Sequence, residues 1–499
     1  MLGQTAVYGT STIIGRLLNY LLVPLYTYQF TNPADYGVNN EFYAYISFLN
    51  ILFTYGMETA LFRFSRTESR PEPVYATAVT ALVVSSVLFV APVFLFPGAL
   101  SDFLGYPGKS VYVVWVGIIL FTDALCAIPF AALRQENRAL RFAGLKFGNI
   151  IINIGLNLFF IGYCKTLYEK VLAGEETAGF FSGLYNPDIG IGYVFISNGI
   201  ANLVTLFFLM PKIYASGFRF NPSLFRRMLK YSAPLIVVGL AGMVNETLDR
   251  ILIKYLSPGD RGLSELGIYG ACYKIPVLMT IFIQAFRYAA EPFFFSYTGK
   301  KEGPEIFSMV MTFFVIAASV VFLGTLLNLS WIQYFIGSSY REGLHIVPVL
   351  LLANWFLGIY YNISIWYKIS GKTGYGALIT IAGAVLTLII NLSLIPVFGY
   401  VAAAWATLVC YAGMMMLVWH LGNKHFPVNY DSKRIWGYLV ISVVLYLISL
   451  LLPEGPGKTE LIFKNLLLLL FLAGVWKFEK TRVFARLKKT LTHDQNKNN

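Results

Sequence analysis

The sequence predicts an all-α, polytopic membrane protein with about fourteen transmembrane helices. Of its 499 residues, 57% are hydrophobic and only 13% are charged, whereas a soluble domain carries about 25% charged residues. The mean hydropathy is +0.64. Apolar stretches of about 20 residues recur along the chain, and each is long enough to cross a hydrocarbon core of about 30 Å. Together these observations indicate a chain that is largely embedded in lipid.

Turn residues delimit the helices, as at Asn32-Pro33, Pro97-Gly98 and Ser257-Pro258-Gly259. Between such breakers we predict helices over residues 5–30, 40–62, 74–97, 111–132, 143–164, 191–211, 232–256, 266–289, 306–329, 344–366, 376–396, 400–421, 435–452 and 460–476.

The 38 Lys and Arg residues are distributed unevenly between the predicted loops. With a cytoplasmic N-terminus, 27 of them fall in cytoplasmic loops and the tail, and 8 fall in outside loops. Because cytoplasmic loops are enriched in Lys and Arg, this bias predicts an inner-membrane protein with both termini in the cytoplasm. The net charge of +13 does not indicate nucleic-acid binding, since the basic residues lie in short loops rather than on a soluble domain.

Two segments of the chain resemble each other at an offset of 230 residues. ADYGVNNEFYAYISFL surrounds Gly37, and SELGIYGACYKIPVLM surrounds Gly267. The repeat predicts two six-helix lobes related by a pseudo-two-fold axis along the membrane normal, with a central cavity between them. We expect an N-lobe over 1–230, a C-lobe over 231–425, and two further helices with a basic cytoplasmic tail over 426–499.

Polar side chains inside the predicted helices mark a candidate binding site. Each ionisable group costs about 2.5–3.5 kcal/mol to insert at the bilayer centre, so such groups face a partner or a cavity. Three of the groups are cations (Arg16, Arg250 and Lys274), and only two acids, Glu246 and Asp249, lie near them in the sequence. Either they form ion pairs between helices, or they line a water-filled cavity that attracts an anion. The candidates are Arg16, Asn19, Glu246, Asp249, Arg250 and Lys274.

Asparagines also recur at helical spacing. Asn149, Asn153 and Asn157 occupy one face of the fifth predicted helix. Amides inside a membrane bond neighbouring helices together, and the alternative is a polar wall that solvates sugar hydroxyls. Asp123 is a lone acid in the fourth predicted helix, and it either carries a proton or ion or makes a local hydrogen bond.

The sequence contains no catalytic or metal-binding motif that we recognise. The cysteines form no CxxC pair and are predicted to be small side chains within helices, and the histidines lack metal-ligand spacing. We found no nucleotide-binding or nucleophile motif. We therefore expect a transporter without a cofactor or metal, not an enzyme. The four cysteines are Cys126, Cys164, Cys272 and Cys410.

Two stretches carry a family resemblance. Residues 3–38, GQTAVYGTSTIIGRLLNYLLVPLYTYQFTNPADYGV, and residues 54–66, TYGMETALFRFSR, resemble polysaccharide biosynthesis membrane proteins of the O-antigen flippase (Wzx) type. These proteins belong to the MOP exporter superfamily, together with the lipid II flippase and the MATE antiporters. The resemblance covers about sixty residues as sequence and the whole chain as topology.

The resemblance implies a flippase that moves undecaprenyl-diphosphate-linked oligosaccharide from the cytoplasmic to the periplasmic leaflet, for O-antigen, lipopolysaccharide or capsule synthesis. On this basis Arg16, Arg250 and Lys274 would contact the diphosphate. Glu58 and Arg63 would form a gate or a structural salt bridge. The expected partners are the lipid-linked oligosaccharide and membrane lipids.

Several points stay open at this stage. Coupling to Na+ or H+ and association with a polysaccharide polymerase are compatible with the resemblance, and we expect a monomer. One alternative is a MATE-like cation-coupled antiporter, although such proteins normally have twelve spans and an apolar or acidic cavity. A membrane polysaccharide polymerase or ligase is a second alternative, and it would need a larger extramembrane site.

Overall fold

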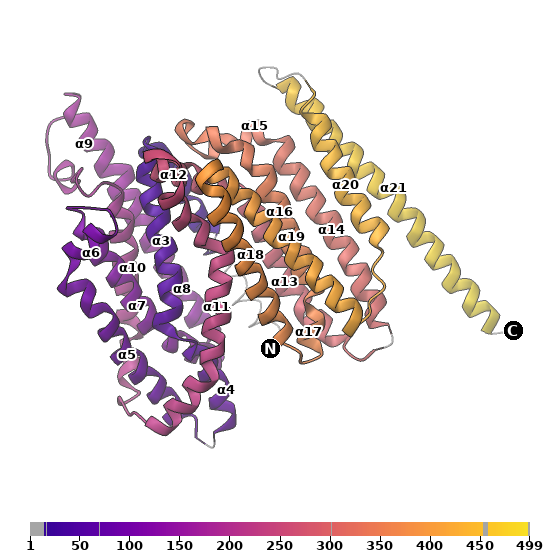
Figure 1. The fold of residues 1–499 in the computed structure, drawn as a ribbon, viewed down its shortest axis with the longest axis horizontal. Helices are drawn as coiled ribbons and strands as arrows, with labels where there is room; N and C mark the ends of the chain where they lie inside the picture. The colour runs from indigo at the N-terminus through magenta and orange to yellow at the C-terminus, as the bar shows by residue number, and fades with distance from the viewer. Residues whose placement is uncertain (1–13, 16, 69, 301, 453–457, 498–499) are drawn as a thin grey trace.

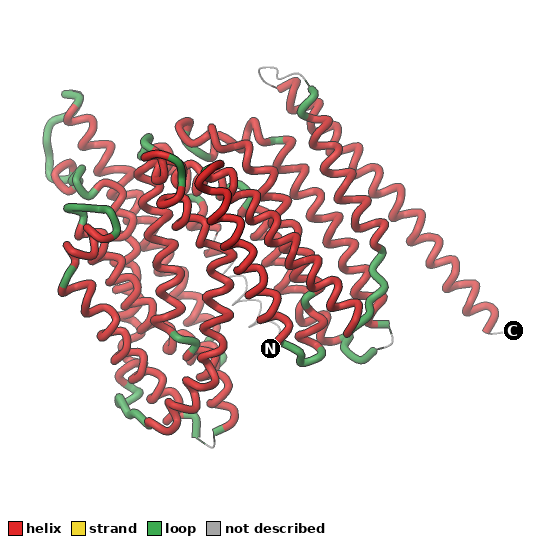
Figure 2. The backbone as a smooth tube through the Cα atoms, viewed as in Figure 1, coloured by secondary structure: helices red, strands yellow, loops and turns green. Residues whose placement is uncertain are grey.

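A computed structural model describes residues 14–15, 17–68, 70–300, 302–452 and 458–497, with side chains up to Lys480 apart from residues 458 and 459. Long helices run roughly alongside one another across the molecule (Figure 1). The described residues form helices and connecting loops without a strand (Figure 2). The prediction of an all-α membrane protein is confirmed.

The N-terminal half, up to residue 221, holds the helices at the left of Figure 1. They are α2 (Leu22–Gln29), α3 (Pro33–Thr54), α4 (Met57–Thr67), α5 (Glu72–Leu95), α6 (Pro97–Phe103), α7 (Ser110–Gln135), α8 (Ala139–Asn157), the π-helix η1 (Leu158–Cys164), α9 (Lys165–Leu172), the short 3-10 helices η2 (Ser182–Leu184) and η3 (Gly190–Gly192), and α10 (Tyr193–Tyr214).

The C-terminal half begins with the 35-residue helix α11 and ends with α20 and α21 at the right edge of Figure 1. Its helices are α11 (Pro222–Leu256), η4 (Gly259–Arg261), α12 (Gly262–Tyr273), α13 (Val277–Ser296), α14 (Gly303–Leu327), α15 (Leu329–Ile332), η5 (Gln333–Phe335), η6 (Ser338–Ile346), α16 (Val347–Ile363), α17 (Ile365–Ile369), α18 (Gly374–Phe398), α19 (Tyr400–His425), α20 (Ser432–Ser449) and α21 (Lys458–Lys497).

The number of spans differs from the expectation of fourteen. Among the described residues, ten helices are long and apolar enough to cross a membrane, and the bent pair α12–α13 brings the number to eleven. The other expected spans fall on α3 and α11 and on the first helix, part of which lies outside the described residues. α3 and α11 are not among the spans that pass the hydropathy criterion, and each carries a buried acid, Glu41 in α3 and Asp249 in α11.

Two predicted helices are interrupted. The helix predicted over 40–62 starts earlier, at Pro33, because the Asn32 side chain caps it by accepting a hydrogen bond from the Ala34 N–H (3.1 Å). It breaks where Tyr55 and Gly56 adopt left-handed backbone angles (φ 33° and 70°). The helix predicted over 266–289 bends by 48° between α12 and α13.

The second break lies at Lys274 and Pro276, and proline accounts for it because it lacks an N–H and cannot continue the helical hydrogen bonding. Three-residue turns keep the backbone bonded across the break: the Lys274 N–H donates to Ala271 (3.1 Å) and the Ile275 N–H donates to Cys272 (3.2 Å). The bend is therefore compatible with a membrane interior, where an unpaired backbone group is costly.

The two halves meet where α3 crosses α12. Gly37 and Gly267 allow the two backbones to touch, since a Cβ on Gly37 would overlap the carbonyl of Leu263 and a Cβ on Gly267 would overlap the carbonyl of Pro33. α11 also packs against α3 and α4 on one side and α18 on the other. The boundary predicted at residue 230 falls inside α11, so the division into two lobes at that point remains a prediction.

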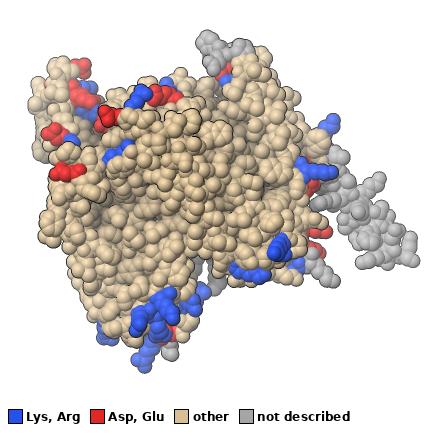
Figure 3. Space-filling view, in the orientation of Figure 1, with Lys and Arg blue, Asp and Glu red and all other residues tan. Residues whose placement is uncertain are grey.

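Basic side chains gather at one face of the molecule, at the lower ends of the helices in Figure 3, where α4 and α17 lie. We call this end the basic face. Acidic side chains are seen mainly along the opposite edge. The start of α11 contributes Arg226, Arg227 and Lys230 to the basic face. This asymmetry is the arrangement that the uneven loop charges predict.

Candidate functional site

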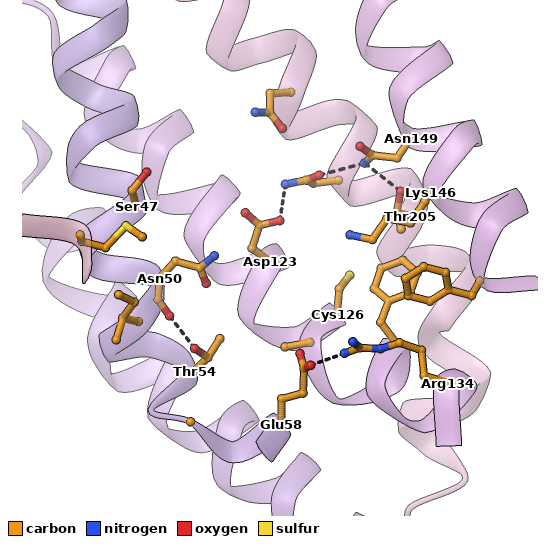
Figure 4. Close-up of a pocket in the computed structure, with 18 residues that line it drawn as sticks. Ser47, Asn50, Thr54, Glu58, Asp123, Cys126, Arg134, Lys146, Asn149 and Thr205 are labelled. Carbon is orange, nitrogen blue, oxygen red and sulfur yellow. Dashed lines mark hydrogen bonds and ion pairs between the residues drawn. The ribbon is translucent and has the colours of Figure 1, made fainter. Parts of the chain in front are cut away.

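A polar cavity of about 780 Å³ lies among the helices of the N-terminal half. It is lined from α3, α4, α7, α8 and α10, with Met243 of α11 at its edge (Figure 4). It extends from Asn198 in α10 to Glu58 and Arg134 near the basic face. The lining residues are Ser47, Asn50, Ile51, Thr54, Gly56, Glu58, Asp123, Cys126, Ala127, Phe130, Arg134, Phe142, Lys146, Asn149, Asn198, Asn202, Thr205 and Met243.

A chain of hydrogen bonds forms one wall of the cavity (Figure 4). The Asn202 amide donates to Asp123 Oδ1 (2.9 Å) and accepts from the Asn149 amide (2.9 Å). The Asn149 amide also lies 3.0 Å from Thr205 Oγ1. The Asn149 amide thus uses both of its N–H groups along the wall and the Asn202 amide uses one, while Asp123 Oδ2 and Asn149 Oδ1 accept no hydrogen bond from a described residue.

An ion pair between Glu58 and Arg134 lies toward the basic end of the cavity. The Arg134 guanidinium also lies 5.2 Å from the centre of the Phe62 ring. The predicted pairing of Glu58 with Arg63 is not formed; Arg63 instead stacks on Tyr231 (4.2 Å). The reason is helical geometry, because residues five apart on α4 point to different sides. Arg134 lies far away in sequence and could not be identified as the partner.

Lys146 is a second cation on the cavity wall. Its ammonium lies 4.4 Å from the centre of the Phe130 ring and forms no ion pair with a described carboxylate. Lys146 interacts electrostatically with the carboxylate of Asp123. The ionisable residues of the lining are thus two acids, Glu58 and Asp123, and two bases, Arg134 and Lys146, so the formal charges of the cavity sum to zero.

The three asparagines predicted to share one helix face have two different roles in the structure. Asn149 lines the cavity. Asn157 is fully buried and accepts a hydrogen bond from Tyr26 (3.0 Å), while the Asn153 amide donates to Asn19 (3.4 Å). Asn153 and Asn157 thus bond α8 to the first helix, as expected of amides that join helices, and neither lines the cavity.

The predicted cluster in the C-terminal half lies away from this cavity. Asp249 is buried and accepts hydrogen bonds from the Tyr269 hydroxyl and from the Arg250 N–H (2.8 Å). The Arg250 guanidinium stacks over Tyr273 (4.9 Å), and its Nε has no hydrogen-bond partner. Asp249 is therefore occupied by neutral donors and does not pair with the guanidinium.

Lys274 stands at the α12–α13 break, within electrostatic range of Arg250. Neither cation forms an ion pair with a described carboxylate, although Glu246 lies near Arg250. The expected ion pairing between helices is therefore absent for these two cations in the described part of the chain. Arg16 lies outside the described residues.

A buried ion pair that sequence reasoning missed joins α3 to α11. Lys254 Nζ lies 2.9 Å from Glu41 Oε1, and the two side chains are 10% and 0% exposed. Glu41 also accepts hydrogen bonds from the hydroxyls of Tyr45 (2.7 Å) and Tyr106. Lys254 donates in addition to the Leu104 carbonyl (2.6 Å). This cluster holds the two halves together at the end of α11 opposite the basic face.

A second missed pair lies in the C-terminal half, where Lys368 of α17 contacts Glu291 of α13 (2.6 Å). It joins the eighth and tenth predicted spans, as Glu58 and Arg134 join the second and fourth. The corresponding offsets, 233 and 234 residues, are close to the 230 of the sequence repeat. The same device therefore recurs in both halves.

Known proteins resemble this chain in sequence and in fold. The curated protein described as the probable low-salt glycan biosynthesis flippase Agl15 of Haloferax volcanii is 20% identical over 439 residues, covering 87% of this chain and 86% of that protein. The solved lipid II flippase MurJ, in an inward closed conformation, matches with a TM-score of 0.73 at 14% identity, covering 95% of this chain and 99% of that one.

An inward-facing multidrug resistance MATE transporter of the MOP superfamily matches with a TM-score of 0.59 at 13% identity, covering 85% of this chain and 96% of that one. At these identities the solved structures establish a shared fold. The profile of the family described as "Polysaccharide biosynthesis protein" matches residues 1–298, which is more than half of the chain. The chain therefore belongs to the polysaccharide biosynthesis protein family.

Proposed function

We propose that this protein is a flippase that moves undecaprenyl-diphosphate-linked oligosaccharide across the inner membrane by alternating access, for surface polysaccharide synthesis. The observation that carries the proposal is the polar cavity of about 780 Å³ within the membrane-spanning helices. A cavity of this size and polarity suits an oligosaccharide better than a lipid chain. The family of the chain and its flippase relative support the same assignment.

The arrangement of closures fits alternating access. Glu41 and Lys254 close the end opposite the basic face, while the cavity reaches Glu58 and Arg134 toward the basic face. With the basic face in the cytoplasm, the structure corresponds to a state that receives substrate from the inside. The cytoplasmic location of both termini, which the loop charges predict, is part of this proposal.

Arg250 and Lys274 are the residues that we expect to bind the anionic part of the substrate. Arg250 and Lys274 lie near each other in the C-terminal half, and neither forms an ion pair with a described carboxylate. A diphosphate supplies the missing negative charge, and a guanidinium can hold phosphate oxygens through two parallel hydrogen bonds. We assign Arg16 to the same role on the strength of the family resemblance. A MATE-like antiporter, by contrast, would favour cationic ligands, which Arg250 and Lys274 oppose.

The test is where lipid-linked repeat units accumulate. In a host lacking this gene, we expect assembled lipid-linked oligosaccharide confined to the cytoplasmic leaflet, where added periplasmic glycosidase cannot reach it. Expression of the intact chain should restore accessibility, and Arg250→Ala should restore less than a tenth of it at equal membrane abundance. Normal export of single, unpolymerised units in the deletion strain would instead support a polymerase.

A further inference from the structure

We propose that the cavity of the N-terminal half selects an uncharged sugar of the substrate, and that the diphosphate is bound elsewhere, by the cations of the C-terminal half. This inference rests on the proposed flippase function and adds the chemical class of sugar that the cavity accepts. Its selecting element is the chain Asp123–Asn202–Asn149–Thr205 along the cavity wall.

The first argument is the charge balance of the cavity. Glu58 is paired with Arg134, and Asp123 faces Lys146, so the lining presents no surplus charge. In the C-terminal half, Arg250 and Lys274 form no ion pair with a described carboxylate and Nε of Arg250 has no hydrogen-bond partner, although Glu246 and Asp249 lie near Arg250. A charged sugar gains no net Coulomb attraction from a lining of zero formal charge, whereas the unpaired guanidinium donor of Arg250 suits a diphosphate oxygen.

The second argument is the direction of the hydrogen bonds. Within the wall the Asn149 amide donates two hydrogen bonds and the Asn202 amide donates one, while Asp123 Oδ2 and Asn149 Oδ1 accept none from a described residue. Sugar hydroxyls and an N-acetyl N–H can donate to these oxygens, whereas a carboxylate or phosphate only accepts. The wall therefore favours a hydroxylated, uncharged ring.

The third argument is that the wall is fixed in place. Asn202 is 8% exposed and bonded to two other helices through Asp123 and Asn149. Thr205 is held in turn by its bond to the Ala201 carbonyl (2.8 Å). Because the acceptors are held by packing and by neighbouring hydrogen bonds, a sugar bound there finds a preorganised surface.

The experiment uses the full chain, purified in detergent, and three soluble probes that share a farnesyl diphosphate: one without a sugar, one with N-acetylglucosamine and one with glucuronic acid. Binding is measured by thermophoresis. We expect the N-acetylglucosamine probe to bind about tenfold more tightly than the bare diphosphate, the gain of one or two good hydrogen bonds. The glucuronic acid probe should show no gain.

Variants localise the effect. Asn149→Ala and Asn202→Ala should each abolish the sugar-dependent gain and leave affinity for the bare diphosphate unchanged. The matched control is Asn465→Ala, which removes a membrane amide that pairs with Asn328 (2.9 Å) between α14 and α21. This control should leave the affinity for all three probes unchanged.

Charge variants make the test sharper. Asp123→Asn gives the cavity one net positive charge and should raise the affinity for glucuronic acid relative to N-acetylglucosamine several-fold. Lys146→Met gives the cavity one net negative charge and should lower the affinity for glucuronic acid relative to N-acetylglucosamine. Equal responses of both probes to both variants would overturn the proposal.

The outcomes separate the inference from the function on which it rests. Arg250-dependent binding of the bare diphosphate with no gain from N-acetylglucosamine would defeat the sugar assignment alone. Failure of the intact protein to bind any of the three probes would defeat the flippase function as well.

Discussion

Gly37 and Gly267 occupy equivalent positions of the sequence repeat and lie against each other in the structure. The contact is reciprocal: Gly37 faces the carbonyl of Leu263, and Gly267 faces the carbonyl of Pro33, each 230 residues from its counterpart. A reciprocal contact of this kind is the signature of a two-fold axis. The pseudo-symmetry axis therefore passes close to the crossing of α3 and α12.

Replacing either glycine should separate the halves. We expect Gly37→Ala and Gly267→Ala each to lower the free energy of unfolding by at least about 1–3 kcal/mol, the usual range for overpacking, and to reduce surface polysaccharide. Gly148→Ala in α8 is the control, because nothing lies within 4 Å of its Cβ position. Thermal unfolding in detergent measures all three. Unchanged stability in both crossing variants would contradict the reciprocal contact.

The buried pair Glu41–Lys254 should be costly to break on one side only. Glu41→Gln or Lys254→Met should destabilise the protein by about 3–5 kcal/mol, because each leaves a buried group unpaired. The double variant Glu41→Met/Lys254→Met should be less destabilised than either single one. Arg227→Met provides the comparison, because its pair with Glu68 is 56% and 30% exposed and should matter by less than about 1 kcal/mol. Additive effects of the two buried substitutions in thermal unfolding would contradict this view.

The ion pair at the basic end of the cavity should matter for transport. We expect Glu58→Ala and Arg134→Ala to reduce surface polysaccharide strongly, and Arg134→Lys to recover part of it, since lysine keeps the charge without the planar fork. Arg63→Ala should have a smaller effect, because Arg63 stacks on Tyr231 and does not contact Glu58. Quantified polysaccharide in complemented deletion strains, at matched protein levels, distinguishes these variants. A larger loss of surface polysaccharide in Arg63→Ala than in Arg134→Ala would instead support the gate of Glu58 and Arg63 that the sequence predicts.

Topology can be checked with reporters. A phosphatase fusion at Asn186, in the loop between α9 and α10, should be active in the periplasm, and a fusion at the C-terminus should be inactive. The expectation follows from the enrichment of Lys and Arg at the basic face. The same side for both fusions would refute the topology.

The sequence was sufficient for those features that depend on pattern. Hydropathy predicted the membrane helices, and the 230-residue repeat identified the two glycines that meet at the axis. It also marked Arg250 and Lys274 as cations without sufficient acid, which agrees with their lack of ion pairs in the described residues.

Features that depend on distant contacts were not predictable. The partner of Glu58 is 76 residues away, and the partner of Glu41 is 213 residues away, so only the fold brings them together. We expected a central cavity lined by the charges of α11, whereas the polar cavity described above lies within the N-terminal half. Of the predicted residues that the structure describes, Asn149, Glu58 and the lone acid Asp123 line it and the others do not, because a helix face cannot be assigned to a cavity before its neighbours are known.

Because of the break at Lys274 and Pro276, the two parts of one bent helix pair pack against different neighbours. α12 is held to α3 by the glycine crossing, while α13 departs at 48° and packs on α14 and α16. In a protein that alternates between two openings, the few residues between α12 and α13 are therefore the place where the backbone would bend in each cycle, as a hinge. Lys274 is one of these hinge residues, so its ammonium lies at the bend. In the flippase proposed above, movement of α13 relative to α12 would displace this ammonium and so change the positive potential at a bound diphosphate.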